Sequence, residues 1–187
     1  MRLALRYKNI DYDYVSVDIH HLTAEEKEEY KLINPMGQIP ALKIDGQILT
    51  QSMSICEYLE ETRGNGLCLF PGDSLQKFKI RSFCEIVNSY VQPLQNHDQQ
   101  ASIVRGLRAL ERSITGHHGP YCFGSDISVA DFCLVPQVYN AIEVFAMHDL
   151  MAECPGLMER YTELMKVPEF QATAPEQQPG FPKADSK

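Results

Sequence analysis

The chain has 187 residues, 44% of them apolar, which is enough for one or two globular domains with a sizeable core. Its formal net charge is -8 and its Lys and Arg residues form no cluster, which argues against a nucleic-acid partner. No apolar stretch approaches the roughly 20 residues that cross a bilayer, and the charged N-terminal residues do not resemble a signal peptide. We therefore expect a cytoplasmic protein that does not bind membranes.

The cysteines and histidines do not have metal-ligand spacing. The doublets His20-His21 and His117-His118 place adjacent side chains, which point in different directions on a helix or strand. The cysteines form no Cys-x-x-Cys pair, so we expect reduced packing residues and no metal site. The six cysteines are Cys56, Cys68, Cys84, Cys122, Cys133 and Cys154.

The first segments predict a helix, a strand and a second helix. Residues 1–8 have helical spacing of apolar side chains and have the pattern of the end of a helix. Residues 12–19 are rich in Tyr, Val and Ile, which favours a strand. Thr23 is placed to cap a charged helix that reaches Leu32.

A β-hairpin and a helix follow. Two short apolar runs, residues 39–44 and 47–50, are joined by Asp45-Gly46, a pair typical of two-residue hairpin turns. Ser54 and Glu57 then have the spacing of a capping box, and we expect that helix to end near Gly64.

The second half of the chain is predicted to be helical. Turn residues fill 64–73, and we place a domain boundary there, giving domains 1–70 and 71–187. Apolar residues recur at helical spacing from Leu75 to Leu94, from Ile103 to Ile114 and from Leu157 to Leu164. The proline-rich tail from about residue 174 is expected to be loosely held.

The strongest helix start is at Ser128. Its hydroxyl can accept from the Asp131 amide while the Asp131 carboxylate accepts from the Ser128 amide. Ile127 and Phe132 can form a hydrophobic staple across this start. We interpret the motif as a folding feature and not as a binding site.

Several stretches together resemble the zeta-class glutathione transferases of the maleylacetoacetate isomerase type. The resemblance runs from residue 2 to about 180, and the Gln-Pro-Leu-Gln-Asn stretch is typical of the zeta class. The stretches are Asn34 to Leu42, Gln51-Ser52, Glu57 to Arg63, Gln92 to Asn96 and Gly124 to Gln137.

This resemblance implies a fold and an activity. The fold is an α/β thioredoxin-like N-terminal domain followed by an all-α C-terminal domain. The activity is the glutathione-dependent cis-trans isomerisation of maleylacetoacetate to fumarylacetoacetate in tyrosine and phenylalanine catabolism, with transferase activity on small electrophiles such as α-haloacids. The cofactor is then glutathione, whose thiolate adds to the double bond and later leaves it.

The resemblance also implies the residues that bind glutathione. The Ile39-Pro40 bond is expected to be cis, so that the backbone at Ile39 pairs with the extended cofactor. Gln51 and Ser52 are expected to hold the γ-glutamyl carboxylate at the start of a helix. From the residues alone, an ordinary N-terminal cap explains Ser52 fully and is the favoured reading, and the resemblance reverses that preference. Gln92 and Asn96 match family positions near the cofactor and substrate.

The chain departs from the family pattern in two places. About 19 residues of the family's first strand, loop and half helix have no counterpart, judged by the length of such elements. The catalytic Ser-Ser-Cys motif is therefore expected before Met1, and no residue of this chain is assigned as catalytic. Between Asn96 and Gly106 roughly a dozen further residues, about three helical turns, have no counterpart. These departures leave open an alternative, a non-catalytic transferase-like binding or interaction protein.

Family members are dimers. We accordingly expect a homodimer in which the helix at residues 53–63 of one chain packs against the long helix after Asp73 of the other. The substrate is expected to be a small electrophilic molecule.

Overall fold

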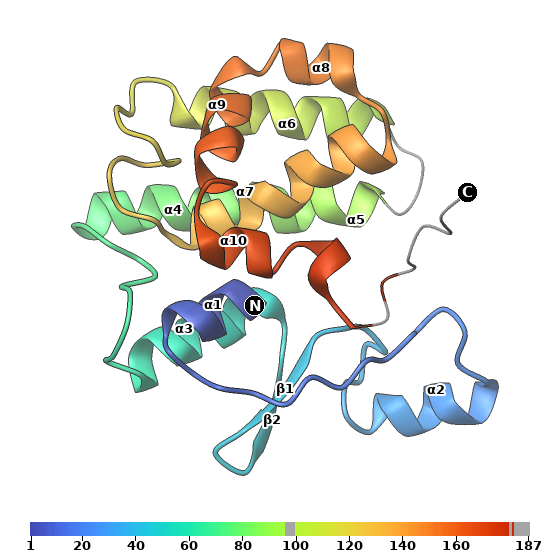
Figure 1. Cartoon of the computed structure of the whole chain (residues 1–187). Coiled ribbons are helices and arrows are strands. Elements are labelled where there is room, and N and C mark those ends of the chain that lie inside the picture. The colour runs from blue at the N-terminus through green and yellow to red at the C-terminus, as the bar shows by residue number, and fades with distance from the viewer. Residues whose placement is uncertain (96–99, 180, 182–187) are drawn as a thin grey trace. The chain divides into compact units, whose positions relative to one another are not determined.

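The computed structural model describes residues 1–95, 100–179 and 181 (Figure 1). The chain forms two compact units. The first comprises Met1–Gly66 with the described residues from Thr173 onward, and the second comprises Leu67–Ala172. The predicted domains, 1–70 and 71–187, remain a prediction.

The first unit contains a two-stranded sheet and short helices. The strands are β1 (Ala41–Ile44) and β2 (Gln47–Thr50), which pair antiparallel. The helices are α1 (Arg2–Tyr7), α2 (Ala24–Lys31), α3 (Ser52–Thr62) and the 3-10 turn η3 (Pro175–Gln177).

Helices α1 and α3 contact each other and supply the core of this unit. The ammonium of Lys8, just after α1, lies 2.6 Å from a carboxylate oxygen of Glu60 on α3, and the Lys8 side chain is almost fully buried. A Cβ at Gly66 would lie 2.1 Å from the Tyr7 carbonyl oxygen, so only glycine allows the chain to pass there. The buried apolar residues of the two helices are Leu3, Ala4, Leu5, Ile55, Cys56 and Leu59.

The hairpin prediction is confirmed. Ala41 pairs with Thr50 and Ile44 with Gln47. Both turn residues have positive φ, 51° at Asp45 and 74° at Gly46, as a two-residue hairpin turn of this type requires.

The hairpin turn is also joined to α3. The Asp45 carboxylate accepts hydrogen bonds from the Tyr58 hydroxyl at 2.6 Å and from Arg63 Nη2 at 2.7 Å. These contacts connect the turn between β1 and β2 to the C-terminal end of α3 and to its C-cap residue, Arg63.

The predicted strand at residues 12–19 is wrong. That segment has no regular secondary structure, and Tyr12, Tyr14 and Val15 are exposed. A strand requires a neighbour that completes its backbone hydrogen bonds, and in the described residues the sheet consists of β1 and β2 alone. Side-chain propensity without such a neighbour does not produce a strand. The helix predicted after Thr23 is confirmed as α2, with a full capping box between Thr23 and Glu26.

The second unit is helical, as predicted. Its helices are α4 (Ser74–Ile86), α5 (Gln92–Gln95), α6 (Gln100–Ile114), α7 (Val129–Tyr139), α8 (His148–Ala152), α9 (Pro155–Leu164) and α10 (Pro168–Ala172). Two π-helical segments, η1 (Val87–Val91) and η2 (Asn140–Val144), continue α4 and α7. The long helix predicted from Leu75 to Leu94 is thus α4, η1 and α5 in direct succession.

Helix α7 lies at the centre of this unit and contacts both α4 and α9 (Figure 1). The capping box predicted at Ser128 is confirmed. Gly106 on α6 permits a close approach to η1, because a Cβ there would lie 2.5 Å from Val91 Cγ2. The buried residues of α7 are Val129, Ala130, Asp131, Phe132, Leu134, Gln137 and Val138.

Candidate functional site

The open end of the hairpin brings two of the predicted site residues together. Because Ala41 pairs with Thr50, Pro40 and Gln51 flank the same end of the two strands. The Ile39-Pro40 peptide bond is cis, as expected from the resemblance. Among the described residues, neither the amide nor the carbonyl of Ile39 has a hydrogen-bond partner, and its side chain is 55% exposed. The Ile39 backbone is therefore available to an extended ligand.

Asn34 holds the loop that leads to Ile39. Its side chain is buried. The side-chain oxygen Oδ1 accepts from the Met36 backbone amide at 3.1 Å, and the side-chain Nδ2 donates to the Gln38 backbone carbonyl. The Tyr30 hydroxyl donates to the same carbonyl at 3.2 Å. Sequence reasoning did not assign Asn34 a role. The signal was its place directly before Pro35, where an Asn side chain commonly closes a local turn.

Gln51 has an unusual backbone conformation. Its φ is 67° and its ψ is 109°, a region that non-glycine residues rarely adopt. Gln51 is the N-cap of α3, yet its side chain makes no capping hydrogen bond. A strained residue that persists next to a helix start indicates a functional position.

Helix α3 begins at Ser52, not at the predicted Ser54–Glu57 capping box, which is therefore wrong. Ser52 is the first helical residue, so the reading of Ser52 as the N-terminal cap is also wrong. The first turn of α3 contains no acidic residue, and the side chain of its N-cap residue, Gln51, makes no capping hydrogen bond. The positive dipole end of the helix favours a carboxylate at this position.

The other two predicted site residues belong to the second half of the chain. Gln92 is the first residue of α5, directly after η1, and it is exposed. π-Helical segments often occur at functional sites, because they change the direction in which the following side chains point. Asn96 lies outside the described residues.

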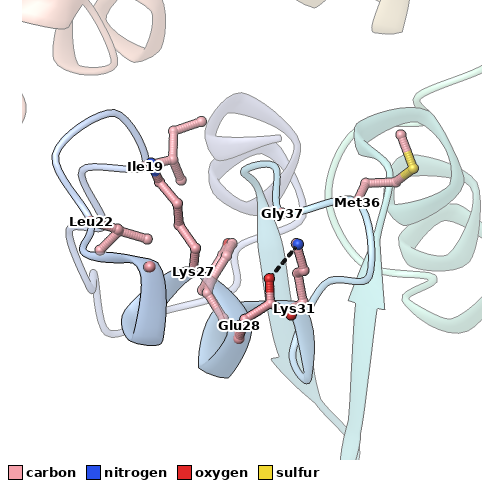
Figure 2. Close-up of a pocket in the computed structure, with 9 residues that line it drawn as sticks. Ile19, Leu22, Lys27, Glu28, Lys31, Met36 and Gly37 are labelled. Carbon is pink, nitrogen blue, oxygen red and sulfur yellow. Dashed lines mark hydrogen bonds and ion pairs between the residues drawn. The ribbon is translucent and has the colours of Figure 1, made fainter.

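A pocket of about 360 Å³ lies beside α2 in the first unit (Figure 2). Its walls are mainly apolar side chains and lysine stems, and the Lys31 ammonium pairs with the Glu28 carboxylate at 2.6 Å. Every residue that lines it is partly or fully exposed. The lining residues are Ile19, Leu22, Ala24, Lys27, Glu28, Tyr30, Lys31, Met36 and Gly37.

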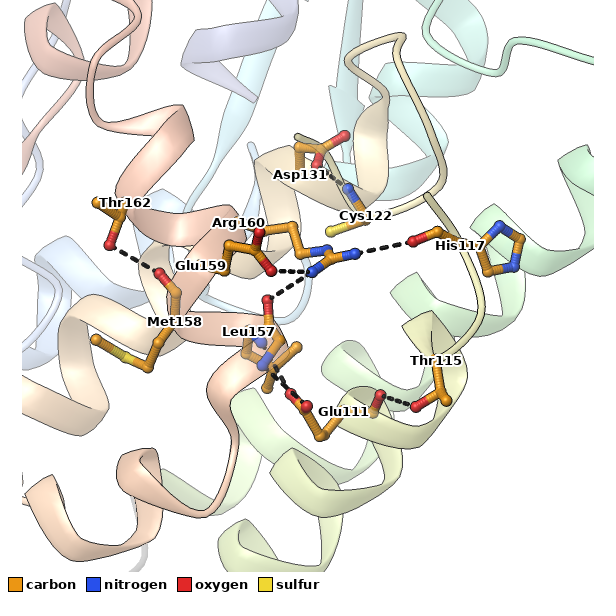
Figure 3. A network of polar contacts seen from close by, with 11 residues as sticks. Glu111, Thr115, His117, Cys122, Asp131, Leu157, Met158, Glu159, Arg160 and Thr162 are labelled. Carbon is orange, nitrogen blue, oxygen red and sulfur yellow. Dashed lines mark hydrogen bonds and ion pairs between the residues drawn. The ribbon is translucent and has the colours of Figure 1, made fainter. Parts of the chain in front are cut away.

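A buried polar network in the helical unit fixes the start of α7 (Figure 3). Asp131 is fully buried and its carboxylate accepts from the Cys122 amide at 2.8 Å, from the Ser128 amide at 2.8 Å and from the Ser128 hydroxyl at 3.0 Å. Burial raises the pKa of Asp131, and the hydrogen bonds from Cys122 and Ser128 oppose that rise. Each carboxylate oxygen accepts from donors of the protein itself, so we interpret the network as structural.

The same network fixes α9. The Glu111 carboxylate accepts from the amides of Gly156 at 2.9 Å and Leu157 at 2.8 Å, which caps the start of that helix (Figure 3). Arg160 on α9 donates to the His117 carbonyl at 2.9 Å. These contacts hold the loop after α6 against α9.

No metal centre is found among the described residues: no three His, Cys, Asp or Glu side chains are arranged to hold an ion. Within the same part of the chain, no helix combines the length and apolar character needed to cross a membrane.

Comparison with protein-family models identifies the family of this chain. Residues 1–62 match the N-terminal domain of glutathione S-transferase, and residues 59–161 match its C-terminal domain. The chain belongs to the glutathione S-transferase family. It is thus a member of an enzyme family, and the predicted transferase architecture is confirmed.

The most similar relatives specify the class. The chain is 38% identical over 196 residues to a probable maleylacetoacetate isomerase 2 of Drosophila melanogaster, covering 97% of this chain and 85% of that protein. It is 37% identical over 196 residues to the maleylacetoacetate isomerase of Mus musculus, covering 97% and 89%. A zeta-class glutathione S-transferase of Euphorbia esula is 34% identical over 198 residues, covering 96% and 85%. These relatives place this transferase in the zeta class.

A solved structure with the same fold carries the cofactor. The maleylacetoacetate isomerase of Methylobacterium extorquens AM1, with bound malonate and glutathione, aligns with a TM-score of 0.84 at 28% identity. The alignment covers 97% of this chain and 93% of that one.

Proposed function

We propose that this transferase is a glutathione-dependent isomerase that converts maleylacetoacetate into fumarylacetoacetate in tyrosine and phenylalanine catabolism. Transfer of glutathione to small electrophiles such as α-haloacids is part of the proposal. The observation that carries it is the open end of the hairpin. There the Ile39 backbone has no partner among the described residues, and the side chain of Gln51, the N-cap of α3, makes no capping bond. The maleylacetoacetate isomerases among the relatives support the choice of substrate.

The proposed cofactor site uses both features. The γ-glutamyl carboxylate accepts hydrogen bonds from the side chains of Gln51 and Ser52 at the start of α3, where the helix dipole favours negative charge. The cysteinyl part of glutathione pairs with the backbone of Ile39, next to Pro40. The resemblance also assigns Gln92 and Asn96 to the cofactor, and that assignment remains part of the proposal.

In this proposal the residues of the chain bind and orient, and glutathione supplies the chemistry. When bound, glutathione would provide the thiolate whose addition to the conjugated double bond leaves a single bond that can rotate, before its departure restores the double bond. Gln51 fixes the γ-glutamyl end of the extended peptide and the Ile39 backbone fixes its cysteinyl part, which holds the sulfur in a defined position relative to the substrate. A cytoplasmic location fits this proposal, because the cytosol holds a reducing glutathione pool.

Titration calorimetry with glutathione tests the binding site. Gln51→Ala and Ser52→Ala each remove a hydrogen bond to a charged carboxylate, which contributes about 1.5–3 kcal/mol. We expect each variant to weaken glutathione binding by about 10- to 100-fold. Ser54→Ala, on the exposed surface of the same helix, is the matched control and should bind as the parent does. Unchanged affinity in both site variants would contradict the assignment.

The backbone of Gln51 gives a second, independent test. Gln51→Gly relieves the positive φ, so the free energy of unfolding should rise by up to about 1 kcal/mol. Glutathione binding should weaken in the same variant. A variant that gains no stability would show that the conformation of Gln51 is not strained.

Isomerase activity separates the proposed enzyme from a non-catalytic binding protein. The protein from its natural source should isomerise a maleyl substrate at a rate that depends on glutathione concentration. Glutathione binding without any turnover would overturn the isomerase proposal and favour the non-catalytic alternative.

We also propose a homodimer, in which α3 of one chain packs against α4 of the other. Leu75 and Phe78 support this, because they are 61% and 64% exposed and lie one turn apart on α4. Sedimentation at micromolar concentration should give the mass of two chains, and Phe78→Glu should give one. Lys77→Glu, the adjacent position on the same helix, should leave the dimer intact. A single-chain mass for the unaltered protein would refute the proposal.

A further inference from the structure

The pocket beside α2 is built from three consecutive parts of the first unit (Figure 2). One wall is a single face of α2, because Ala24, Lys27 and Lys31 recur at helical spacing. The segment that precedes the helix adds Ile19 and Leu22, and the loop that follows the helix completes the pocket. Its lining includes none of the described residues that are assigned to glutathione, so it is a different site from the proposed cofactor site.

Hydrogen bonds hold the pocket in shape on both sides of α2. The Thr23 amide donates to the Glu26 carboxylate at 2.8 Å, which fixes the start of the helix. After the helix, the Gly37 amide donates to the Asn34 carbonyl at 2.7 Å, and the φ of 64° at Gly37 lets the loop close. The Met36 amide donates to the Asn34 side chain at 3.1 Å. The pocket is therefore preformed, as most small-molecule sites are.

The lining combines apolar surface with an unpaired positive charge. Ile19 and Leu22 are half-buried and supply apolar surface. Lys31 pairs with Glu28 at 2.6 Å, whereas the Lys27 ammonium has no hydrogen bond or ion pair within the described part of the chain. Figure 2 shows the Lys27 side chain extending from α2 toward Ile19. Two lysines and one glutamate leave this lining with one net positive charge, in a chain whose formal net charge is -8.

We propose that this pocket binds a small monocarboxylate with an apolar body, such as an aryl-substituted alkanoate. The apolar body packs on Ile19 and Leu22, and the carboxylate pairs with the Lys27 ammonium. The body excludes water from one side of this ion pair, which strengthens the attraction between the two charges. The pocket volume of about 360 Å³ lies near the lower end of the range of about 300–1,000 Å³ for ligand pockets, so the ligand is small.

Titration of the whole chain with 4-phenylbutyrate, followed by NMR of the side-chain methyl groups, tests the proposal. We expect saturable shifts at the methyl groups of Ile19, Leu22 and Met36. The uncharged 4-phenylbutanamide should bind about two- to fivefold more weakly, which is the range expected from the loss of an exposed ion pair. Inorganic phosphate has no apolar body and should not shift these methyl groups.

Three variants separate the charge from the apolar surface. Lys27→Gln should weaken the carboxylate to the affinity of the amide and leave the amide unchanged, whereas Lys27→Arg should keep the preference for the carboxylate. Ala24→Leu places a larger side chain in the pocket and should weaken both ligands. Lys43→Gln changes an exposed lysine of β1 outside the lining and should give the parent result.

Two outcomes would overturn the inference. One is equal affinity of the unaltered protein for the carboxylate and the amide, which would show that Lys27 does not recognise the charge. The other is displacement of 4-phenylbutyrate by glutathione, which would place the probe in the cofactor site. Both are measured on the unaltered protein and neither requires enzyme activity, so the result depends neither on the folding of the variants nor on the isomerase proposal.

Discussion

Replacing Asp131 by Asn should destabilise the helical unit strongly. The Asp131 carboxylate is fully buried and accepts three hydrogen bonds, two from backbone amides at 2.8 Å and one from the Ser128 hydroxyl at 3.0 Å. An Asn side chain has one acceptor oxygen, and its amide group would face the N–H of either Cys122 or Ser128. At least one buried donor would then have no partner.

The expected cost follows from two opposing effects. Hydrogen bonds to a charged group contribute about 1.5–3 kcal/mol each, so the loss of two would cost about 3–6 kcal/mol. Burial raises the pKa of Asp131, which shows that the charge itself is costly to bury, and the neutral Asn recovers part of that cost. We expect a net loss of about 2–4 kcal/mol in the free energy of unfolding.

Urea unfolding followed by circular dichroism measures this loss. Asp126→Asn is the matched control, because Asp126 is exposed in the same loop and should change stability by less than about 0.5 kcal/mol. A loss below about 1 kcal/mol for Asp131→Asn would refute the reasoning, since it would mean that the three hydrogen bonds do not require a carboxylate.

Three further changes test other contacts of the helical unit. Glu111→Gln should cost about 1–2 kcal/mol by urea unfolding, because its carboxylate caps the first amides of α9. Gly156→Ala should cost a similar amount, since its Cβ would lie 2.7 Å from Glu111 Oε1, and should add little in the Glu111→Gln background. Burial, and then the charge of Lys79, lowers the pKa of His117 below its ordinary value of about 6.5. The unfolded state then binds more protons, so stability should fall as pH drops through about 6.5, and His117→Gln should make that fall shallower.

Structural features that depend only on residues close together in the chain could be predicted from the sequence. The Thr23 cap, the Ser128–Asp131 capping box and the Asp45-Gly46 turn each depend on neighbours in the chain, and all three are confirmed. The Ser54–Glu57 box shows the limit of such patterns. Its spacing is correct, yet α3 starts at Ser52, because the pattern does not state which turn of a helix is the first.

Features that join distant parts of the chain could not be predicted in this way. The strand expected at residues 12–19 depended on a pairing partner, which residue propensities do not reveal. The bonds from Arg63 to Asp45 and from the Cys122 amide to Asp131 likewise connect segments that only the fold brings together. Sequence reasoning could see that these polar residues were present, but not which partners they would find.

The candidate site combines both cases, and Gln51 shows how. The resemblance indicated this residue, but nothing in a Gln side chain predicts a φ of 67°, which Gly or Asn would adopt at lower cost. Selection for stability alone would favour one of those residues at the start of α3. A Gln that remains there in a strained conformation, with no capping bond of its own, is explained if its side chain has another partner. At the open end of the hairpin, beside the Ile39 backbone that has no partner in the described part of the chain, an extended peptide with a terminal carboxylate meets that requirement.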